Sequence, residues 1–155
     1  MQFNSSEDID APIEAVFREV TDFAAFERAA RWRCTELRRT DTLAAPGVGM
    51  GWHARFMLRE RLREVDVTLV RHEPPRAIAL DVASQAVTGR MQVDLEELTP
   101  SRTRLRVDLT VAPQGIAGRL MMQPLKLMRG NLTRRFSLRV AAFAMDVEDR
   151  FKSRV

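Results

Sequence analysis

The chain has 155 residues, of which 45% are hydrophobic and 30% charged, which suits one globular domain spanning residues 1–155. No apolar run approaches the ~20 residues that cross a bilayer and the N-terminus lacks the basic and apolar regions of a signal peptide, so we expect a cytoplasmic protein. The net charge is +4, but most arginines alternate with Asp and Glu and only 6% of residues are aromatic, which argues against nucleic acid as a partner.

The first thirty residues predict a strand followed by two short helices. Residues 3–10 read as the strand. Asp10 can then cap a helix and Pro12 suits its first turn, with apolar residues at helical spacing up to residue 20. Thr21 or Asp22 can cap the second helix. In that helix Phe23 and Phe26 share the apolar face, and Glu27 and Arg28 face outward.

Residues 31–113 change to a period of two, which predicts about six antiparallel strands with one buried face and one wet face. Turn signals separate the strands, at residues 46–49, 74–75 and 99–101. The side chains assigned to the buried face begin with Trp32 and Cys34. They continue with Trp52, Ala54, Phe56, Leu58, Val65, Val67, Leu69, Ile78, Leu80, Val82, Met91, Val93, Leu95, Leu105, Val107, Leu109 and Val111.

The last third returns to helical spacing, with an apolar stripe from Met121 to Val147. Pro124 and the pair Gly130-Asn131 interrupt it and predict a start, bend or kink in its first half. The stripe and the buried face of the sheet must cover each other. The fold class is therefore α+β: a curved antiparallel sheet of six to seven strands around a long C-terminal helix, with two short helices between strands 1 and 2.

The order and spacing of several short segments resemble the START-like superfamily, also called SRPBCC, which includes polyketide cyclase/dehydrase-like proteins. The resemblance implies a helix-grip fold with a cavity between the sheet and the long helix. Members bind lipids, sterols, hormones, polyketides or quinones, and some are cyclases, but they share no catalytic motif. The segments are Asp10-Ala11-Pro12-Ile13-Glu14-Ala15-Val16-Phe17, Thr21-Asp22-Phe23, Gly47-Val48-Gly49 with Trp52, Glu73-Pro74-Pro75-Arg76, Thr103-Arg104-Leu105 and Gly118-Arg119-Leu120.

One segment departs from the family pattern. Relatives often place glycine at the turn after the third strand, whereas this chain has none between Leu58 and Leu62. The geometry and register of that hairpin therefore stay open.

The candidate ligand pocket combines aromatic residues of the early elements with the stripe of the long helix. Each residue alone is also explained as ordinary core, but for the group the implied fold favours a cavity. Methionines on the helix could form an adaptable wall for apolar ligands. The candidates are Phe23, Phe26, Trp32, Trp52, Phe56, Met121, Met122, Leu125, Met128, Leu132, Arg135, Phe136 and Arg139.

The long helix is unusually basic, because no acidic residue occurs between Asp108 and Asp146. Arg135 and Arg139 fall within or beside the apolar stripe. They could pair with carboxylates such as Glu97 or Asp94 at the sheet edge. One of them could instead receive the acidic head group of an apolar ligand. Alternatively, the basic helix and its Met-rich start could contact an anionic membrane transiently.

No catalytic, metal or cofactor site is visible in the sequence. Cys34 is a lone cysteine, and neither His53 nor His72 has a second ligand at metal-binding spacing. Asp81 or Asp94 could serve a cyclase, but both alternate with inward residues and are expected to face solvent.

We therefore predict the binding, with possible transport or presentation, of a small hydrophobic or amphipathic ligand such as a lipid, polyketide or quinone. A polyketide cyclase/aromatase-like enzyme using the same cavity is one alternative. A membrane-surface or protein-interaction module using the basic helix is the other. The sequence does not determine the oligomeric state.

Overall fold

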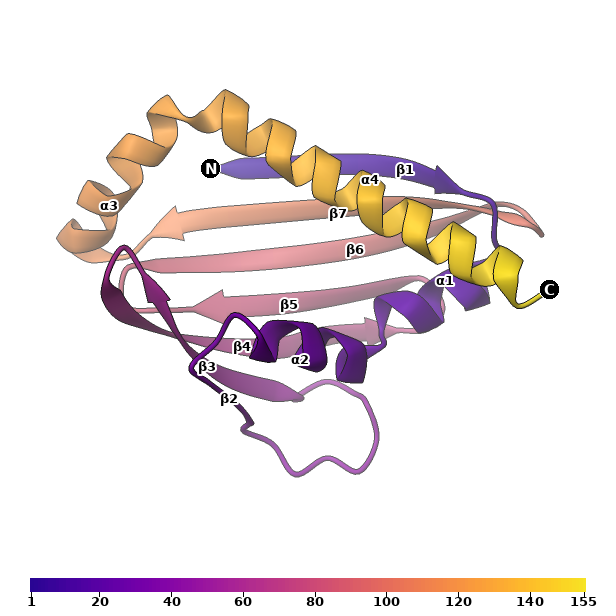
Figure 1. Ribbon diagram of the computed structural model, residues 1–155, viewed down its shortest axis with the longest axis horizontal. Helices are drawn as coiled ribbons and strands as arrows, with labels where there is room; N and C mark the ends of the chain where they lie inside the picture. The colour runs from indigo at the N-terminus through magenta and orange to yellow at the C-terminus, as the bar shows by residue number, and fades with distance from the viewer.

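A computed structural model describes all residues 1–155 and contains seven strands and four helices (Figure 1). In chain order these are β1 Gln2–Ile9, α1 Ile13–Val20, α2 Phe23–Arg31, β2 Glu36–Arg39, β3 Gly51–Leu58, β4 Arg61–Glu73, β5 Ala77–Ala83, β6 Val87–Thr99, β7 Arg102–Pro113, α3 Gly115–Leu127 and α4 Arg129–Ser153.

All seven strands form one antiparallel sheet in the order β1-β7-β6-β5-β4-β3-β2. The period-two prediction is confirmed, because alternate side chains face the core and the solvent. The register shifts between Leu69 and Arg71 in β4 and between Glu97 and Thr99 in β6. Bulges of this kind bend a strand and increase its twist, and so help the sheet to curve.

The helices lie on one face of the sheet, with α4 crossing it obliquely and α1 and α2 beside α4 (Figure 1). The core lies between these layers, and strand residues such as Leu69 and Leu105 pack in it with Val140, Ala144 and Val147 of α4. The buried Thr103 hydroxyl donates a hydrogen bond of 2.8 Å to the carbonyl of Ala11, which satisfies the only buried polar residue. The α+β helix-grip prediction is confirmed.

The C-terminal stripe divides into two helices. α3 ends at Leu127, Met128 adopts a non-helical conformation, and α4 begins at Arg129. Pro124 has no N–H for the carbonyl of Leu120, so the last turn of α3 is weakened just before the break. The expected interruption is therefore present, and it turns α3 away from the line of α4 (Figure 1).

The β3–β4 hairpin closes through a two-residue turn despite having no glycine. Leu58 pairs with Arg61, and the two residues between them have left-handed backbones, with φ of 53° at Arg59 and 64° at Glu60. Left-handed φ at both central positions is the geometry that matches the twist of a hairpin. The turn has a backbone geometry that favours glycine, and these two side chains carry the strain that glycine would avoid.

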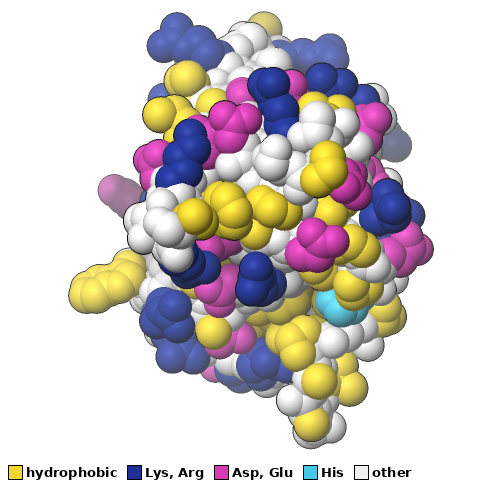
Figure 2. Space-filling model, turned by 90° about the vertical axis from the view of Figure 1, so that its right-hand side faces the viewer, with side chains coloured by type: hydrophobic (Ala, Val, Ile, Leu, Met, Phe, Trp, Pro, Cys, Tyr) yellow, Lys and Arg dark blue, Asp and Glu magenta, His cyan; other side chains and the backbone are white.

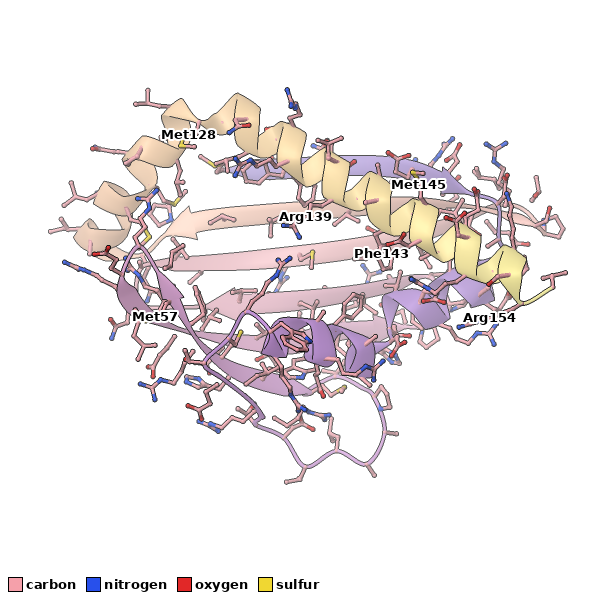
Figure 3. All side chains as sticks on the ribbon, in the orientation of Figure 1. Met57, Met128, Arg139, Phe143, Met145 and Arg154 are labelled. Atoms are coloured by element: carbon pink, nitrogen blue, oxygen red, sulfur yellow. The ribbon has the colours of Figure 1, made fainter.

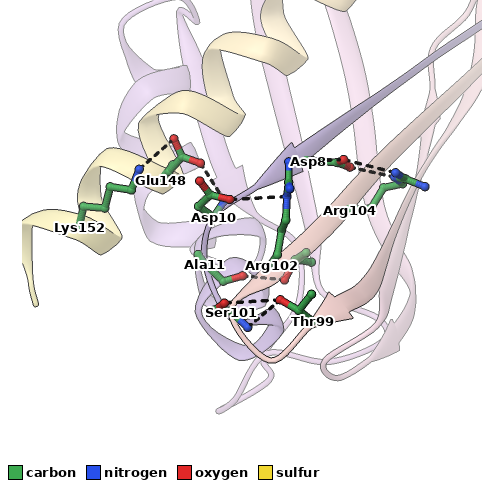
Figure 4. A network of polar contacts seen from close by, with 10 residues as sticks. Asp8, Asp10, Ala11, Thr99, Ser101, Arg102, Arg104, Glu148 and Lys152 are labelled. Carbon is green, nitrogen blue, oxygen red and sulfur yellow. Dashed lines mark hydrogen bonds and ion pairs between the residues drawn. The ribbon is translucent and has the colours of Figure 1, made fainter.

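A polar network fixes the C-terminal half of α4 to the end of β1 (Figure 4). The backbone N–H of Asp10 donates to the Glu148 carboxylate at 2.7 Å, and Lys152 lies 3.5 Å from the same side chain. The N–H donor is the main cause that holds the pKa of Glu148 below its ordinary value. Arg150 adds a contact of 3.1 Å to Glu19 of α1. These contacts set the position from which α4 crosses the sheet.

Candidate ligand cavity

A partly open cavity of about 510 Å³ lies between α2, α4 and the central strands. Eighteen of its twenty lining residues are hydrophobic, and the charged ones are Glu27 and Arg139. Its size and apolar wall are typical of small-molecule sites. The lining residues are Val20, Phe23, Phe26, Glu27, Ala30, Cys34, Leu37, Trp52, Ala54, Val67, Ile78, Leu80, Met91, Val93, Leu105, Val107, Phe136, Arg139, Val140 and Phe143.

The position of the cavity depends on where α1 packs on the sheet. α4 packs directly on β1, while α1 packs beside it on β6 and β7 and also contacts α4. The α1 side chains Val16 and Phe17 belong to the buried core, together with Leu69 and Val147. Farther along, the strands offer side chains of moderate size to the gap, among them Ala54. The space between α4 and the sheet that α1 does not occupy is left unfilled, and Val20 at the end of α1 lines it.

Aromatic side chains line the cavity from both helices. Phe23 of α2 lies on Trp52 of β3 with a ring-centroid distance of 5.6 Å. Phe26, which is 45% exposed, faces Phe143 of α4 at 6.2 Å. The second pair spans the two helices, and partial exposure places it at the mouth. These contacts bring α2 and α4 together above the strands.

Glu27 belongs to a chain of polar contacts beside the cavity, and the expectation that it faces outward was wrong. Its carboxylate accepts a hydrogen bond of 2.8 Å from Trp52 Nε1 and lies 3.8 Å from Arg39. Arg39 stacks over the Trp52 ring at 5.5 Å and binds Asp41 through two nitrogens at 2.6 and 2.8 Å. This guanidinium is the first of several donors that hold the pKa of Asp41 far below its ordinary value.

Arg139 has no comparable partner. It projects from α4 toward the sheet (Figure 3) and lines the cavity, yet it takes part in no salt bridge or side-chain hydrogen bond. The expected pairing of Arg135 and Arg139 with Glu97 or Asp94 is absent, because Asp94 instead lies 3.8 Å from Arg71 and accepts a hydrogen bond from Gln92. The guanidinium of Arg139 is therefore available to a ligand.

Five of the candidate pocket residues come together in this cavity: Phe23, Phe26, Trp52, Phe136 and Arg139. Trp32 does not, and its side chain is 92% exposed. α2 continues to Arg31 and Trp32 caps it in a helical conformation, so the strand periodicity assumed for this residue does not apply. Phe56 shares the face of Trp52 but lies nearer the β3–β4 turn, beyond the lining.

The candidates on α3 and the start of α4 also lie outside the cavity. The break at Met128 directs α3 past the end of the sheet, where it contacts β7 instead of continuing along the groove. Met122 is buried there and Met128 is exposed. The residues that this placement separates from the cavity are Met121, Met122, Leu125, Met128, Leu132 and Arg135.

Most lining residues that the pocket prediction missed are inward-facing strand residues. Leu80, Met91 and Val93 were assigned to the buried face from their period, but that period does not distinguish a filled core from a cavity wall. Cys34 also lines the cavity. A weak indication that Glu27 lines the cavity is its position one residue after Phe26, on a short helix with aromatic neighbours.

The remaining polar candidates lie elsewhere. The Asp81 side chain is partly exposed, as predicted, and binds Arg90 at 2.6 Å; this guanidinium lowers the pKa of Asp81. His53 contacts Asp66 at 2.7 Å, and His72 lies against Phe17 with ring centroids 5.8 Å apart. The structure contains no group of three or more side chains arranged to hold a metal ion.

Comparisons with solved structures agree on the fold. The Zhui aromatase/cyclase from Streptomyces superposes with a TM-score of 0.71 at 14% identity, covering 97% of this chain and 95% of that one. Norcoclaurine synthase from Thalictrum flavum gives 0.64 at 9% identity, with 97% and 86% covered. A polyketide-cyclase-like protein from Corynebacterium glutamicum gives 0.57 at 20% identity, with 97% and 91% covered. A search of curated proteins finds no match.

No helix in the structure is both long enough and apolar enough to cross a membrane.

The family model described as "polyketide cyclase / dehydrase and lipid transport" matches residues 1–146. This match covers nearly the whole chain, and it agrees with the START-like resemblance and with the helix-grip architecture. The chain belongs to the polyketide cyclase/dehydrase and lipid transport family.

Proposed function

We propose that the protein binds a small hydrophobic or amphipathic molecule in the cavity between α2, α4 and the sheet. The observation that carries this proposal is a volume of about 510 Å³ lined by eighteen hydrophobic residues among twenty. Apolar surface left in contact with water is unfavourable by roughly 25 cal/mol per Å². A ligand of matching size would remove that contact, and its own apolar surface would be buried in the same step.

A neutral fluorophore, N-phenylnaphthylamine, tests the proposal. We expect saturable fluorescence enhancement with the wild-type protein. Leu80→Trp places an indole in the cavity and should weaken binding about tenfold. Leu138→Trp makes the same change at an exposed position of α4 outside the cavity and should leave binding unchanged. Absence of saturable binding, or equal loss in both variants, would contradict the proposal.

A cyclase-like enzyme is the second candidate, favoured by the carboxylate of Glu27 in the cavity wall. Ring closure of a polyketide requires a base that removes a proton beside a carbonyl, and a carboxylate within reach of a bound substrate can do this. The test is deuterium exchange at the central carbon of an aromatic 1,3-diketone, followed by NMR. Wild-type protein should accelerate the exchange, and Glu27→Gln should abolish the acceleration while retaining fluorophore binding. No acceleration by the wild type would exclude this enzyme function for the diketone class.

A further inference from the structure

Arg139 is the only cation that lines the cavity. It has no carboxylate within salt-bridge distance, and no side-chain hydrogen bond involves it. The other charged lining residue, Glu27, is satisfied by Trp52 and lies near Arg39. The wall therefore holds one neutralised anion and one cation without an acceptor.

The surroundings add positive charge. α3 and the first part of α4 contain no acidic residue, and Arg135 lies one helical turn before Arg139. Like charges at this spacing repel each other slightly, and an anion placed between them would relieve the repulsion. The sheet beneath supplies apolar residues to the lining, and these cannot accept a hydrogen bond.

A neutral ligand that filled the mouth would displace water from the guanidinium of Arg139 without replacing its hydrogen bonds, which is unfavourable. A carboxylate would replace that water with charge-assisted and potentially bidentate hydrogen bonds. We propose that the ligand is an amphipathic acid, with its apolar body against the strands and an oxyanion bound to Arg139. This inference rests on the proposed function, because it assigns the head group of a ligand in the same cavity.

The test compares decanoate with methyl decanoate as competitors of N-phenylnaphthylamine. Wild-type protein should bind the acid about tenfold more tightly than the ester. Arg139→Met keeps most of the side-chain length, removes the charge, and should abolish this preference by weakening the acid alone. Arg139→Lys should restore part of it. Arg135→Met removes a neighbouring charge that does not line the cavity and should retain most of the preference.

The outcomes separate the two proposals. Equal affinities of wild-type protein for acid and ester, or equal losses of both in Arg139→Met, would overturn the acid assignment while ligand binding stands. Loss of the preference in Arg135→Met to the same extent would also overturn it, because general charge would then explain the effect. If neither competitor nor fluorophore bound, the cavity proposal would fail and this inference with it.

A second inference rests on a different observation, the outer face of α3. Ile116, Leu120 and Leu127 share one side of this helix, because spacings of four and seven bring residues to the same face. Their exposed fractions are 79%, 62% and 91%. The opposite side, which includes Gly118 and Met122, already packs against the protein. α3 therefore carries a second apolar face that nothing in the chain covers.

The β3–β4 hairpin adds apolar side chains at the same end of the molecule. Met57, Leu58 and Leu62 are each about half exposed there. Figure 3 shows Met57 at the end of the long axis where Met128 also lies, and α3 occupies this end in Figure 1. Two separate elements thus present apolar side chains at one end of the molecule.

Charge distinguishes α3 and the start of α4 from the opposite end of the molecule. Arg119, Lys126 and Arg129 lie on α3 or at the start of α4, with no acidic residue between them. At the other end, positive and negative side chains are interspersed (Figure 2), as in the contact between Arg150 and Glu19. Apolar side chains flanked by cations suit the interface of an anionic bilayer. We infer that α3 and the β3–β4 hairpin dock on an anionic membrane surface.

Sedimentation with vesicles tests this inference. Wild-type protein should sediment with phosphatidylcholine vesicles that contain phosphatidylserine, less at high salt, and less with phosphatidylcholine alone. Leu120→Gln combined with Leu127→Gln should reduce sedimentation about tenfold. Leu138→Gln combined with Met145→Gln, at exposed positions of α4, is the matched control and should have no effect.

Three results would overturn the docking inference: no sedimentation at low salt, equal binding to neutral vesicles, or equal loss in the control variant. Light scattering measures the oligomeric state and so tests whether a second copy of the chain covers this face. A wild-type dimer that the α3 variant converts to a monomer would show that a second copy covers this face in place of a membrane.

Discussion

Asp41 shows how one carboxylate can organise a loop beside the cavity. Besides the two bonds from Arg39, it accepts hydrogen bonds of 2.9 Å from the backbone N–H groups of Leu43 and Gly51. It thereby joins the end of β2 to the start of β3 and fixes the guanidinium that stacks on Trp52. The polar edge of the cavity depends on this arrangement.

We predict that Asp41→Asn lowers the melting temperature, and that the loss depends on pH. The folded pKa of Asp41 lies below its ordinary value of 3.8, so its ionised contacts stabilise the folded state above that pH. Their contribution is lost as the pH falls through the folded pKa. The difference between wild type and variant should be full at neutral pH and should shrink below about pH 4.

Thermal unfolding followed by circular dichroism across this range measures the effect. Asp146→Asn changes an exposed aspartate of α4 that has no ion pair, and it should show no such difference. A loss for Asp41→Asn that stays constant down to the lowest pH would contradict the assignment.

At the scale of elements, α3 depends on one glycine for its position. A side chain at Gly118 would collide with the backbone carbonyl oxygen of Ala86. The same oxygen accepts a hydrogen bond of 2.8 Å from Gln114, directly before the helix. α3 can therefore approach the β5–β6 connection only without a side chain at this position.

We predict that Gly118→Ala destabilises the protein by about 1–3 kcal/mol, the usual cost of forcing extra volume into a packed contact. Gly130→Ala is the matched control, because open space surrounds that position in α4. Alanine there should be neutral or stabilising by up to about 1 kcal/mol. Chemical denaturation of both variants measures the difference, and similar effects of the two would refute the predicted clash.

For substitutions in the β3–β4 turn we predict the opposite effect, a gain of stability. Arg59 and Glu60 both have left-handed φ, which favours asparagine and glycine. Replacing the pair with Asn-Gly should stabilise the protein by about 1 kcal/mol in denaturant unfolding. An Ala-Ala replacement removes the same charges without relieving the backbone, so it should not stabilise; a gain of equal size with Ala-Ala would assign the effect to charge.

At the scale of the whole molecule, the interior combines a filled core with a cavity. Leu69 is fully buried and does not line the cavity, whereas its cross-strand partner Leu80 does. A leucine in a filled core loses packing on all sides when truncated, and the cost rises with the void that remains. A leucine that already borders a void has fewer contacts to lose.

We predict that Leu69→Ala costs about 2–5 kcal/mol, and that Leu80→Ala costs distinctly less than Leu69→Ala. Leu138→Ala, at an exposed position of α4, should change stability by less than about 0.5 kcal/mol. Equilibrium unfolding of the three variants orders these costs. Equal losses for the first two would show that the cavity is collapsed or filled in solution.

Local patterns in the sequence were enough to predict the elements. Hydrophobic spacing distinguished strands from helices, and Asp22 does cap α2 by accepting a hydrogen bond from Ala25. The same local information misassigned Trp32, because α2 continues to Arg31 and Trp32 has a helical backbone, so its side chain does not follow the period of a strand. It also could not show that Glu27 turns toward Trp52, a residue that is distant in sequence.

The sequence by itself determined the α+β class, the order of elements, the buried face of the strands β3 to β7 and the interruption near Pro124, since each depends on neighbouring residues. Only the tertiary structure decided which buried side chains border a cavity. That outcome depends on how α1, α2 and α4 pack on the sheet and on the direction α3 takes after the break at Met128. Both are arrangements of elements far apart in the chain, and spacing along the sequence does not encode them.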